Sequence, residues 1–162
     1  MIKYIENNSI FDSKADALIN PVNCKGTMGK GIAKEFKYRF PECFPPYKKA
    51  CDEGLLKPGI LLLVSLNVQL DFFNWKRPSI ILFPTKYHWR EKSKLEWIEQ
   101  GLYYLKNNYL SWGIRSVGMP KLGCGLGGLE WDEVKRLIEK YFIDDKLEIE
   151  LYLSTTSLLE NI

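Results

Sequence analysis

The sequence predicts an α/β fold in three layers (α/β/α), with helices on both faces of a mixed, largely parallel central sheet. Strand-like and helix-like patterns alternate along the chain, and strands separated by helices usually pair in parallel. Some strand-like segments are apolar at every position, which is typical of strands covered on both faces. The 162 residues have the length of one domain and contain no repeat or linker. We therefore expect a single domain over residues 1–162.

Six segments have the pattern of β-strands. In residues 147–153 every second residue is apolar, which is typical of a strand with one buried face. Residues 60–64 are apolar without interruption, which favours a strand buried on both faces. We expect strands at residues 2–5, 17–22, 60–68, 79–83, 116–119 and 147–153.

Four segments have helical spacing. Ile32 and Phe36 lie four residues apart within residues 29–38. Ser93 and Glu96 form a capping-box pattern that predicts the start of a helix. Residues 130–142 have a similar pattern and predict a second helix of this kind. One face of the helix after Ser93 is apolar at Leu95, Ile98, Leu102 and Leu105. A further short helix is expected at residues 47–52.

Composition restricts the class of protein. Hydrophobic residues make up 46% and charged residues 27%, and 23 basic residues against 20 acidic ones give a net charge of +3. This charge is too small to indicate a nucleic-acid binder by itself, although it permits a local basic face. The four cysteines form no C-x-x-C pair and His88 is the single histidine, so we expect no metal site. Because residues 1–6 already have the pattern of a strand and no long apolar run occurs, we expect a cytoplasmic protein that contacts no membrane.

A first glycine-rich segment, NPVNCKGTMGKGI at residues 20–32, follows an apolar strand and leads into a helix. Gly26, Gly29 and Gly31 allow the backbone to approach a ligand, and the start of the helix adds positive potential for a phosphate. The segment is neither a P-loop nor a dinucleotide-binding fingerprint. The alternative interpretation is a flexible turn.

A second segment, PKLGCGLGGLEW at residues 120–131, also joins a strand to a helix. It contains four glycines in six residues, and each glycine loses much backbone entropy on folding. A nest of backbone amides around an anion explains this composition, and a plain turn is again the alternative. Ligands of such sheets bind beyond the carboxyl ends of the strands, so the two loops together predict the two walls of a diphosphate cleft.

The two segments resemble the signature of the macrodomain family, and the similarity extends over essentially the whole chain. The motifs that carry it are NPVNCKGTMGKGIAKEF and MPKLGCGLGGLEW. Within the family, NCKGTMGKGIA, FPTKYHWR and LGCGLGG look most like the branch of DNA ADP-ribosyl glycohydrolase antitoxins. The resemblance implies binding of ADP-ribose without a cofactor, an ADP-ribosylated single-stranded DNA substrate and a cognate ADP-ribosyltransferase toxin as partner. Antitoxins of this branch usually carry a further domain. The sequence is therefore compatible both with a stand-alone protein and with one domain of a longer antitoxin.

The resemblance also implies roles for individual residues. Asn23 takes the place of the asparagine that faces the distal ribose, and Lys86 that of the catalytic lysine. The lysine amine could attack C1 of the ring-opened ribose and form a Schiff base, or it could act as a cation. Residues expected to contact ADP-ribose in or near the first loop are Ser9, Ile10, Asn20, Asn23, Cys24, Lys25, Gly26, Met28, Gly29, Lys30, Gly31 and Ile32. Those expected near the second loop and the sheet edge are Thr85, Pro120, Leu122, Gly123, Cys124, Gly125, Leu126, Gly127, Gly128 and Leu129.

Two positions depart from the wider family. Ser9 stands where many macrodomains have an aspartate that reads adenine, and Asp12 is not expected to replace it. We therefore expect backbone amides and apolar contacts to hold adenine. Gly127 stands where a related human enzyme that removes terminal ADP-ribose from protein has an acid, so a lysine–aspartate mechanism is not supported. The antitoxin branch likewise has no acid at this position.

His88, Trp89 and Arg90 directly follow the catalytic-lysine motif and could contact nucleic acid by stacking and phosphate binding. In the alternative interpretation, Trp89 covers the core and Arg90 is solvated. His88 as a general base and a Cys–His nucleophilic pair with Cys24 or Cys124 are further alternatives. Basic residues cluster near both regions and could steer single-stranded nucleic acid, although a solvated helix face has the same composition.

The sequence is compatible with three functions. The first is an enzyme that removes ADP-ribose from a base in DNA, with thymidine as the expected base, and so reverses a toxin's modification. The second is a module that binds ADP-ribose without cleaving it. The third is hydrolysis of ADP-ribose esters on protein carboxylates or of a small metabolite.

Overall fold

The computed structural model describes residues 1–66 and 77–154. Within these residues the chain forms one six-stranded sheet in the order β1-β6-β5-β2-β4-β3. All neighbouring strands are parallel except β3, which pairs antiparallel with β4. The strands are β1 (Ile2–Ile5), β2 (Ala17–Val22), β3 (Leu62–Val64), β4 (Ser79–Pro84), β5 (Ser116–Pro120) and β6 (Glu148–Tyr152). The expected mixed, largely parallel sheet is confirmed.

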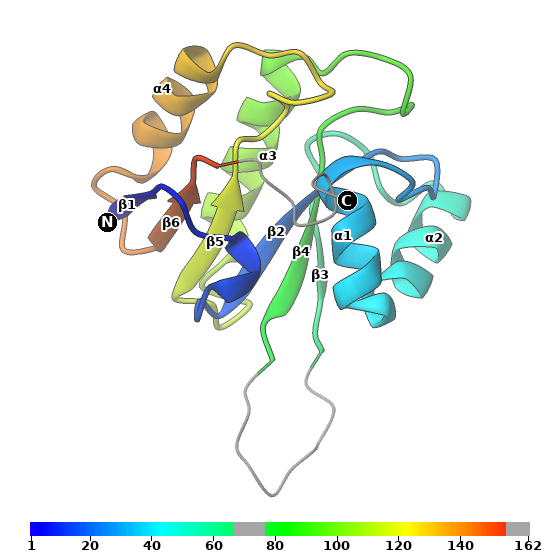
Figure 1. Cartoon of the computed structure of the whole chain (residues 1–162), viewed down its shortest axis with the longest axis horizontal. Helices are drawn as coiled ribbons and strands as arrows, with labels where there is room; N and C mark the ends of the chain where they lie inside the picture. Colours follow the sequence, from blue (N-terminus) through cyan, green and yellow to red (C-terminus); the bar gives the residue numbers. More distant parts are fainter. Residues whose placement is uncertain (67–76, 155–162) are drawn as a thin grey trace, which may run out of the picture.

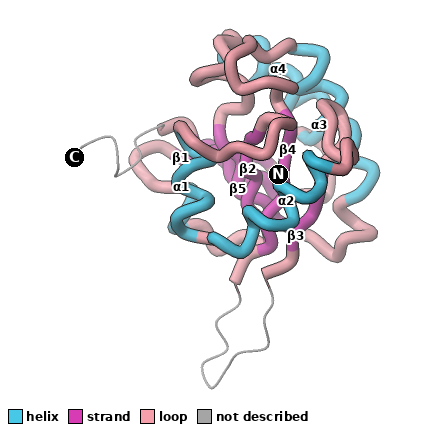
Figure 2. The backbone as a smooth tube through the Cα atoms, turned by 90° about the vertical axis from the view of Figure 1, so that its right-hand side faces the viewer, coloured by secondary structure: helices cyan, strands magenta, loops and turns pink. Residues whose placement is uncertain are grey.

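Helices cover both faces of this sheet, as the sequence predicted (Figure 1). The helices α1 (Gly31–Arg39) and α2 (Phe44–Asp52) lie on one side, and α3 (Leu95–Asn108) and α4 (Trp131–Phe142) lie on the other. Figure 2 shows the same chain after a turn of 90°, with the helices gathered around the strands. Two short 3₁₀ helices, η1 (Ile10–Asp12) and η2 (Pro41–Cys43), join these elements. Within residues 1–66 and 77–154, no helix has both the length and the apolarity needed to cross a membrane.

The uninterrupted apolar runs of the central strands serve two separate cores. Along β4, Ile81 and Phe83 pack into a core with α3 and α4, whereas Ile80 and Leu82 pack into a core with α1 and α2. Residues of β2 alternate in the same way. Because successive side chains of a strand point to opposite faces, a strand between two helical layers must be apolar at every position.

The strand expected at residues 60–68 is shorter than predicted. β3 begins only at Leu62, because the backbone N–H of Ile60 donates to the Lys57 carbonyl in a turn and the Ile60 side chain is exposed. Residues 67 and 68 lie outside the described residues. β3 lies at one edge of the sheet and is its antiparallel strand, so the apolar run does not indicate a strand in the middle of the sheet.

The expected capping box at Ser93 is wrong. Lys94 is the N-cap residue of α3 and its side chain makes no capping hydrogen bond. The Ser93 backbone N–H instead donates to the Gly127 carbonyl at 3.0 Å, and its hydroxyl is buried. The tertiary contact with the second glycine loop therefore replaces the local cap. α4 also lacks a side-chain cap, since its N-cap residue Glu130 makes no capping hydrogen bond.

The remaining helices differ from the prediction by a few residues. α1 begins at Gly31 rather than at residue 29. α2 begins at Phe44 rather than at residue 47, because its first turn contains proline, whose fixed φ suits the first positions of a helix.

Candidate functional site

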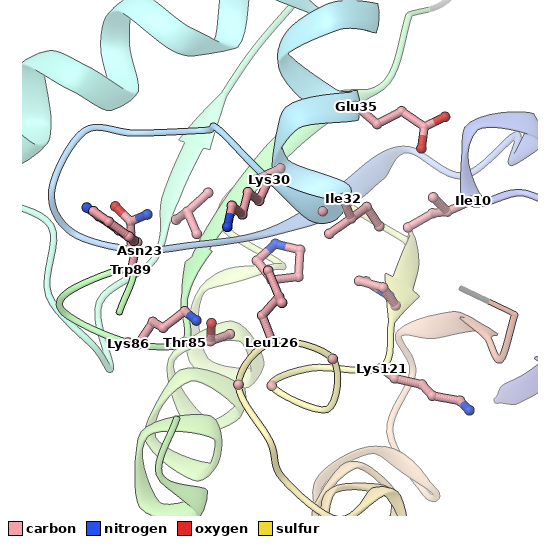
Figure 3. Close-up of a pocket in the computed structure, with 18 of the residues that line it drawn as sticks. Ile10, Asn23, Lys30, Ile32, Glu35, Thr85, Lys86, Trp89, Lys121 and Leu126 are labelled. Atoms are coloured by element: carbon pink, nitrogen blue, oxygen red, sulfur yellow. The ribbon is translucent and has the colours of Figure 1, made fainter. Parts of the chain in front are cut away.

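A cavity of about 640 Å³ lies at the carboxyl ends of β2, β4 and β5 (Figure 3). These strands are parallel and adjacent, so their carboxyl ends meet at one edge of the sheet. The residue that follows each strand, Asn23, Thr85 or Lys121, lines the cavity. The site is therefore at the edge where ligands of parallel sheets bind.

The cavity is lined by residues from both glycine loops, the sheet edge, η1 and the last strand. They are Ser9, Ile10, Phe11, Pro21, Val22, Asn23, Thr27, Gly29, Lys30, Gly31, Ile32, Ala33, Glu35, Thr85, Lys86, Trp89, Pro120, Lys121, Gly123, Gly125, Leu126, Gly127, Tyr152 and Ser154.

Asn23 holds the first loop (residues 23–30) in shape. Its Nδ2 donates to the carbonyl and the hydroxyl of Thr27, at 3.0 and 3.1 Å. Its Oδ1 accepts from the Lys25 backbone N–H at 2.9 Å and lies 2.8 Å from the buried Tyr47 hydroxyl. An asparagine amide has two donor and two acceptor positions, so these contacts use its whole capacity. The geometry favours a positioning role for Asn23 rather than direct chemistry.

The end of the first loop offers backbone amides to the cavity. Lys30 is the N-cap residue of α1 and makes no side-chain cap, so no side chain occupies the first amides of the helix. Gly31 has a φ of +58°, a conformation that glycine adopts without strain. Gly29, Lys30, Gly31 and Ile32 all line the cavity. This wall can accept an anionic group by its amides and the helix dipole.

The second loop (residues 121–129) forms the opposite wall and is held by backbone hydrogen bonds. The Leu129 N–H donates to the Gly123 carbonyl at 2.9 Å, and the Gly128 N–H donates to the Gly125 carbonyl at 3.1 Å. Leu126 is 62% exposed at the tip of the loop. It faces the first loop closely enough that a Cβ on Gly31 would lie 3.8 Å from Leu126 Cδ1.

The backbone at Gly127 leaves no room for a side chain. A Cβ there would overlap the Ser93 hydroxyl and lie 2.5 Å from the Gly123 carbonyl oxygen. Because Ser93 and Gly127 are also joined by a backbone hydrogen bond, neither can move away easily. The absence of an acid in this loop therefore has a steric reason in this chain.

Lys86 lies at one end of the cavity and is partly buried. Burial lowers its pKa, the positive charge of Lys92 lowers it further, and Glu91 acts in the opposite direction. Burial lowers a lysine pKa because it disfavours the charged form. The site therefore raises the fraction of Lys86 that carries a neutral, nucleophilic amine at a given pH.

The backbone around Lys86 is tied to the first loop. The Thr85 N–H donates to the Val22 carbonyl at 2.9 Å, and the Cys24 N–H donates to the Tyr87 carbonyl at 2.8 Å. These bonds continue the pairing of β2 and β4 beyond the two strands. They place Lys86 beside Asn23, as Figure 3 shows.

The segment after Lys86 presents an aromatic and basic surface. The rings of His88 and Trp89 stack with centroids 5.1 Å apart, and Arg90 Cζ lies 4.5 Å from the Trp89 centroid. Trp89 is 44% exposed and lines the cavity, so it does not cover the core. His88 and Arg90 lie outside the lining, and His88 Nδ1 accepts a hydrogen bond from the Arg90 backbone.

The cysteines offer no reactive thiolate. Burial raises the pKa of Cys24 to about 12 and that of Cys124 to about 11. A nucleophilic cysteine needs a lowered pKa, so the geometry does not favour the Cys–His pair. Within the part of the chain that the structure describes, no three His, Cys, Asp or Glu side chains form a group that could hold a metal ion.

Part of the predicted site residues lies together at the cavity and part does not. Those in the lining are Ser9, Ile10, Asn23, Gly29, Lys30, Gly31, Ile32, Thr85, Lys86, Trp89, Pro120, Gly123, Gly125, Leu126 and Gly127. Those outside it are Asn20, Cys24, Lys25, Gly26, Met28, His88, Arg90, Leu122, Cys124, Gly128 and Leu129. Asn20, Met28 and Leu122 are outside because their side chains are buried below the loops, whereas Lys25 points to solvent.

Sequence reasoning missed several lining residues. They are Phe11, Pro21, Val22, Thr27, Ala33, Glu35, Lys121, Tyr152 and Ser154. Glu35 had a usable signal, since it lies four residues after Gly31 and so on the same face of α1. Tyr152 and Ser154 had none, because only the sheet order brings β6 next to β5 and so to this edge.

Comparison with known proteins gives a consistent result. The family model of the Macro domain matches residues 19–138. A DNA ADP-ribosyl glycohydrolase of Mycobacterium tuberculosis is 43% identical over 142 residues, which are 88% of this chain and 39% of that protein. The solved macrodomain of M. tuberculosis DarG superposes with a TM-score of 0.86 at 40% identity and covers 95% of this chain and 98% of that one. Thermosipho africanus DarTG in complex with ADP-ribose gives a TM-score of 0.87 at 36% identity over 94% of this chain and 41% of that one.

The chain spans about two fifths of the length of the curated relatives that it matches first. The match to the family model nevertheless includes both glycine loops and Lys86. The identity to the M. tuberculosis relative and the superposition cover most of this chain. On these grounds the chain belongs to the macrodomain family.

Proposed function

We propose that this protein binds ADP-ribose in the cavity and removes it from a base in DNA, with thymidine as the expected base. The observation that carries the proposal is a partly buried Lys86 of lowered pKa at one end of a cavity walled by two glycine loops. The name of the M. tuberculosis relative, a DNA ADP-ribosyl glycohydrolase, supports the reaction. The complex of T. africanus DarTG with ADP-ribose supports the ligand.

The cavity suits ADP-ribose in size and charge. Its volume of about 640 Å³ lies within the range of about 300–1,000 Å³ that is usual for ligand pockets. The amides at the start of α1 and in the second loop would bind the diphosphate from its two sides. The distal ribose would then lie at the end with Asn23 and Lys86, where the bond to the base is broken.

Lys86 would act as a nucleophile. The distal ribose opens when its C1–O4 bond breaks and O4 takes a proton, which leaves C1 as an iminium carbon on the base nitrogen. The neutral amine of Lys86 attacks this C1, the bond from C1 to the base nitrogen breaks, and the base leaves with the electron pair and a proton from the amine as the Schiff base forms. Water then hydrolyses the resulting Schiff base, which releases ADP-ribose and restores the lysine. The lowered pKa increases the share of the neutral amine, which is the form that this route requires.

Trp89 and Arg90 would hold the DNA next to the reacting bond. The exposed Trp89 ring at the mouth of the cavity can stack on an unpaired base, and Arg90 can contact a phosphate. Both contacts favour single-stranded DNA. The T. africanus relative is a fusion of a DNA ADP-ribosyl transferase with a glycohydrolase, which supports an ADP-ribosyltransferase toxin as partner. A substrate in DNA would place this protein in the cytoplasm.

Calorimetry and release assays test the proposal together. ADP-ribose is expected to bind and to raise the melting temperature, since a ligand that binds only the folded state stabilises it. Release of ADP-ribose is then compared between a modified single-stranded oligonucleotide and a protein modified on carboxylates. Faster release from DNA supports the proposal, release from protein alone indicates an ester hydrolase, and binding without release indicates a binding module. Absence of binding at millimolar ADP-ribose contradicts all three of these functions, because each requires that ADP-ribose binds.

The pH dependence of release reports the charge state of Lys86. Because the reacting amine must be neutral, the rate is expected to rise with pH up to the lowered pKa of Lys86 and to level off above it. Lys92→Gln removes one of the causes that lower this pKa, so the rise should move to higher pH. The control is Lys94→Gln. Lys94 lies over the Trp97 ring, so its loss should leave the pH dependence of the release rate unchanged. A rate that falls with rising pH over the same range would show that Lys86 acts as a cation.

A further inference from the structure

Glu35 is a buried carboxylate at the end of the cavity opposite Lys86. The residue is 4% exposed and lines the cavity from α1. It is the one acidic residue among the described residues that line the cavity. Figure 3 shows it on the side of Ile10, whereas Lys86 and Asn23 lie on the other side. Ionised side chains are rarely this buried unless they are paired or hydrogen-bonded, so the partners of this carboxylate show what it can bind.

One oxygen of this carboxylate is held in place. Arg39 Nε donates to Oε1 at 3.1 Å, one turn along α1. The Arg39 guanidinium also lies over the Phe11 ring, with Cζ 4.6 Å from its centroid. Among residues 1–66 and 77–154, no hydrogen bond to Glu35 Oε2 is found. The carboxylate therefore has a defined orientation and one acceptor that remains for a ligand.

The surroundings of Glu35 suit a flat heterocycle. Ile10, Phe11 and Tyr152 contribute apolar side chains to the lining at η1 and the end of β6. The Ser9 hydroxyl accepts from the Phe11 backbone N–H at 3.2 Å and so caps η1. Ser9 therefore offers the ligand no negatively charged hydrogen-bond acceptor. The one charged acceptor next to these apolar side chains is Glu35.

We propose that Glu35 selects the adenine base of the ligand by accepting a hydrogen bond from its exocyclic amine at Oε2. The inference rests on the proposed function, which places the distal ribose at Lys86 and hence the adenosine at the Glu35 end. Hypoxanthine has a carbonyl oxygen in place of the amine, and this oxygen would face the carboxylate and be repelled. The fold thus provides from α1 the carboxylate that the position of Ser9 lacks.

Two other acids near Ser9 do not serve this role. Asp12 and Asp16 both lie outside the cavity lining. Asp16 Oδ2 accepts from the Arg115 backbone N–H at 2.8 Å, just before the start of β5. Adenine recognition therefore depends on Glu35 rather than on an acid close to Ser9 in the sequence.

Titration calorimetry with ADP-ribose and with inosine diphosphate ribose tests the proposal. The unmodified protein is expected to prefer ADP-ribose by at least about tenfold, the effect of a hydrogen bond to a charged acceptor. In Glu35→Gln the amide can accept from the amine of adenine or donate to the carbonyl of hypoxanthine. The preference should then fall to within about threefold, mainly because inosine diphosphate ribose binds better. If Glu35 had a purely structural role, Glu35→Gln would lower the affinity for both ligands equally.

The control is Glu53→Gln. Glu53 also pairs with a basic residue four positions away, Lys49, at 3.8 Å, but it lies outside the cavity lining, so the preference should not change. An unchanged preference in a folded Glu35→Gln overturns the inference and leaves the proposed function intact. Equal affinity of the unmodified protein for the two ligands also overturns it, even if the variant does not fold. Failure of the unmodified protein to bind ADP-ribose contradicts the proposed function itself.

Discussion

Lys86→Ala is expected to slow the release of ADP-ribose from modified DNA by at least about a hundredfold, the usual effect of losing a catalytic group. Affinity for ADP-ribose should remain within about tenfold, because the two loops rather than Lys86 form the walls of the cavity. Single-turnover release from a modified oligonucleotide measures the first effect, and calorimetry measures the second. Loss of rate without loss of binding would separate chemistry from recognition.

Two further variants complete this test. Lys121 also lines the cavity but lies away from Lys86, so Lys121→Ala should keep most of the rate. Lys86→Arg keeps the charge but cannot form a Schiff base, so it should remain as slow as the alanine variant. Substantial activity of Lys86→Arg would indicate electrostatic catalysis. Full activity of Lys86→Ala on every substrate would contradict a catalytic lysine and direct attention to the loop around Asn23.

Gly127→Ala is expected to lower the free energy of unfolding by about 1–3 kcal/mol, the usual cost of forcing an extra group into a packed region. The new methyl group would collide with Ser93 and the Gly123 carbonyl and displace the second loop. Affinity for ADP-ribose should fall by about tenfold or more, because the displaced amides no longer face the diphosphate. Urea denaturation and calorimetry measure the two effects.

Gly125→Ala provides the matched control for stability. It lies two residues away in the same loop, and a Cβ there would meet nothing within 4 Å. Its free energy of unfolding should change by less than about 1 kcal/mol. Gly127→Asp should destabilise the protein at least as strongly as Gly127→Ala and should not increase the rate of release. Equal stability of the Gly127 and Gly125 variants would show that the loop has room for a side chain.

Much of the fold could be predicted from the sequence because it depends on local patterns. The alternation of apolar strands with amphipathic helices predicted the helical layers. The uninterrupted apolar runs predicted strands covered on both faces, and the structure shows this arrangement at Ile80–Phe83. The glycines of the two loops and their positions between strand and helix predicted a cleft at one edge of the sheet. Lys86 could be singled out only through the resemblance to a family, since nothing in its local sequence separates it from a solvated lysine.

Other features were decided by contacts between segments that are far apart in the sequence. Ser93 has the local pattern of a helix cap, yet it binds the second loop, because a backbone partner at Gly127 competes with the cap. The Tyr47 hydroxyl reaches Asn23 from α2 and holds this cavity residue in place, a contact that no local pattern indicated.

The sequence by itself therefore determined the order and type of the elements, the composition of the two loops and the lysine next to them. Only the tertiary structure decided which side chains face the cavity. Glu35 became a cavity residue because α1 packs against η1 through Phe36 and Phe11. Gly127 admits no acid because Ser93 occupies the space beside it. The physical reason is that periodicity reports burial along one element, whereas a binding site depends on the packing of several elements against each other.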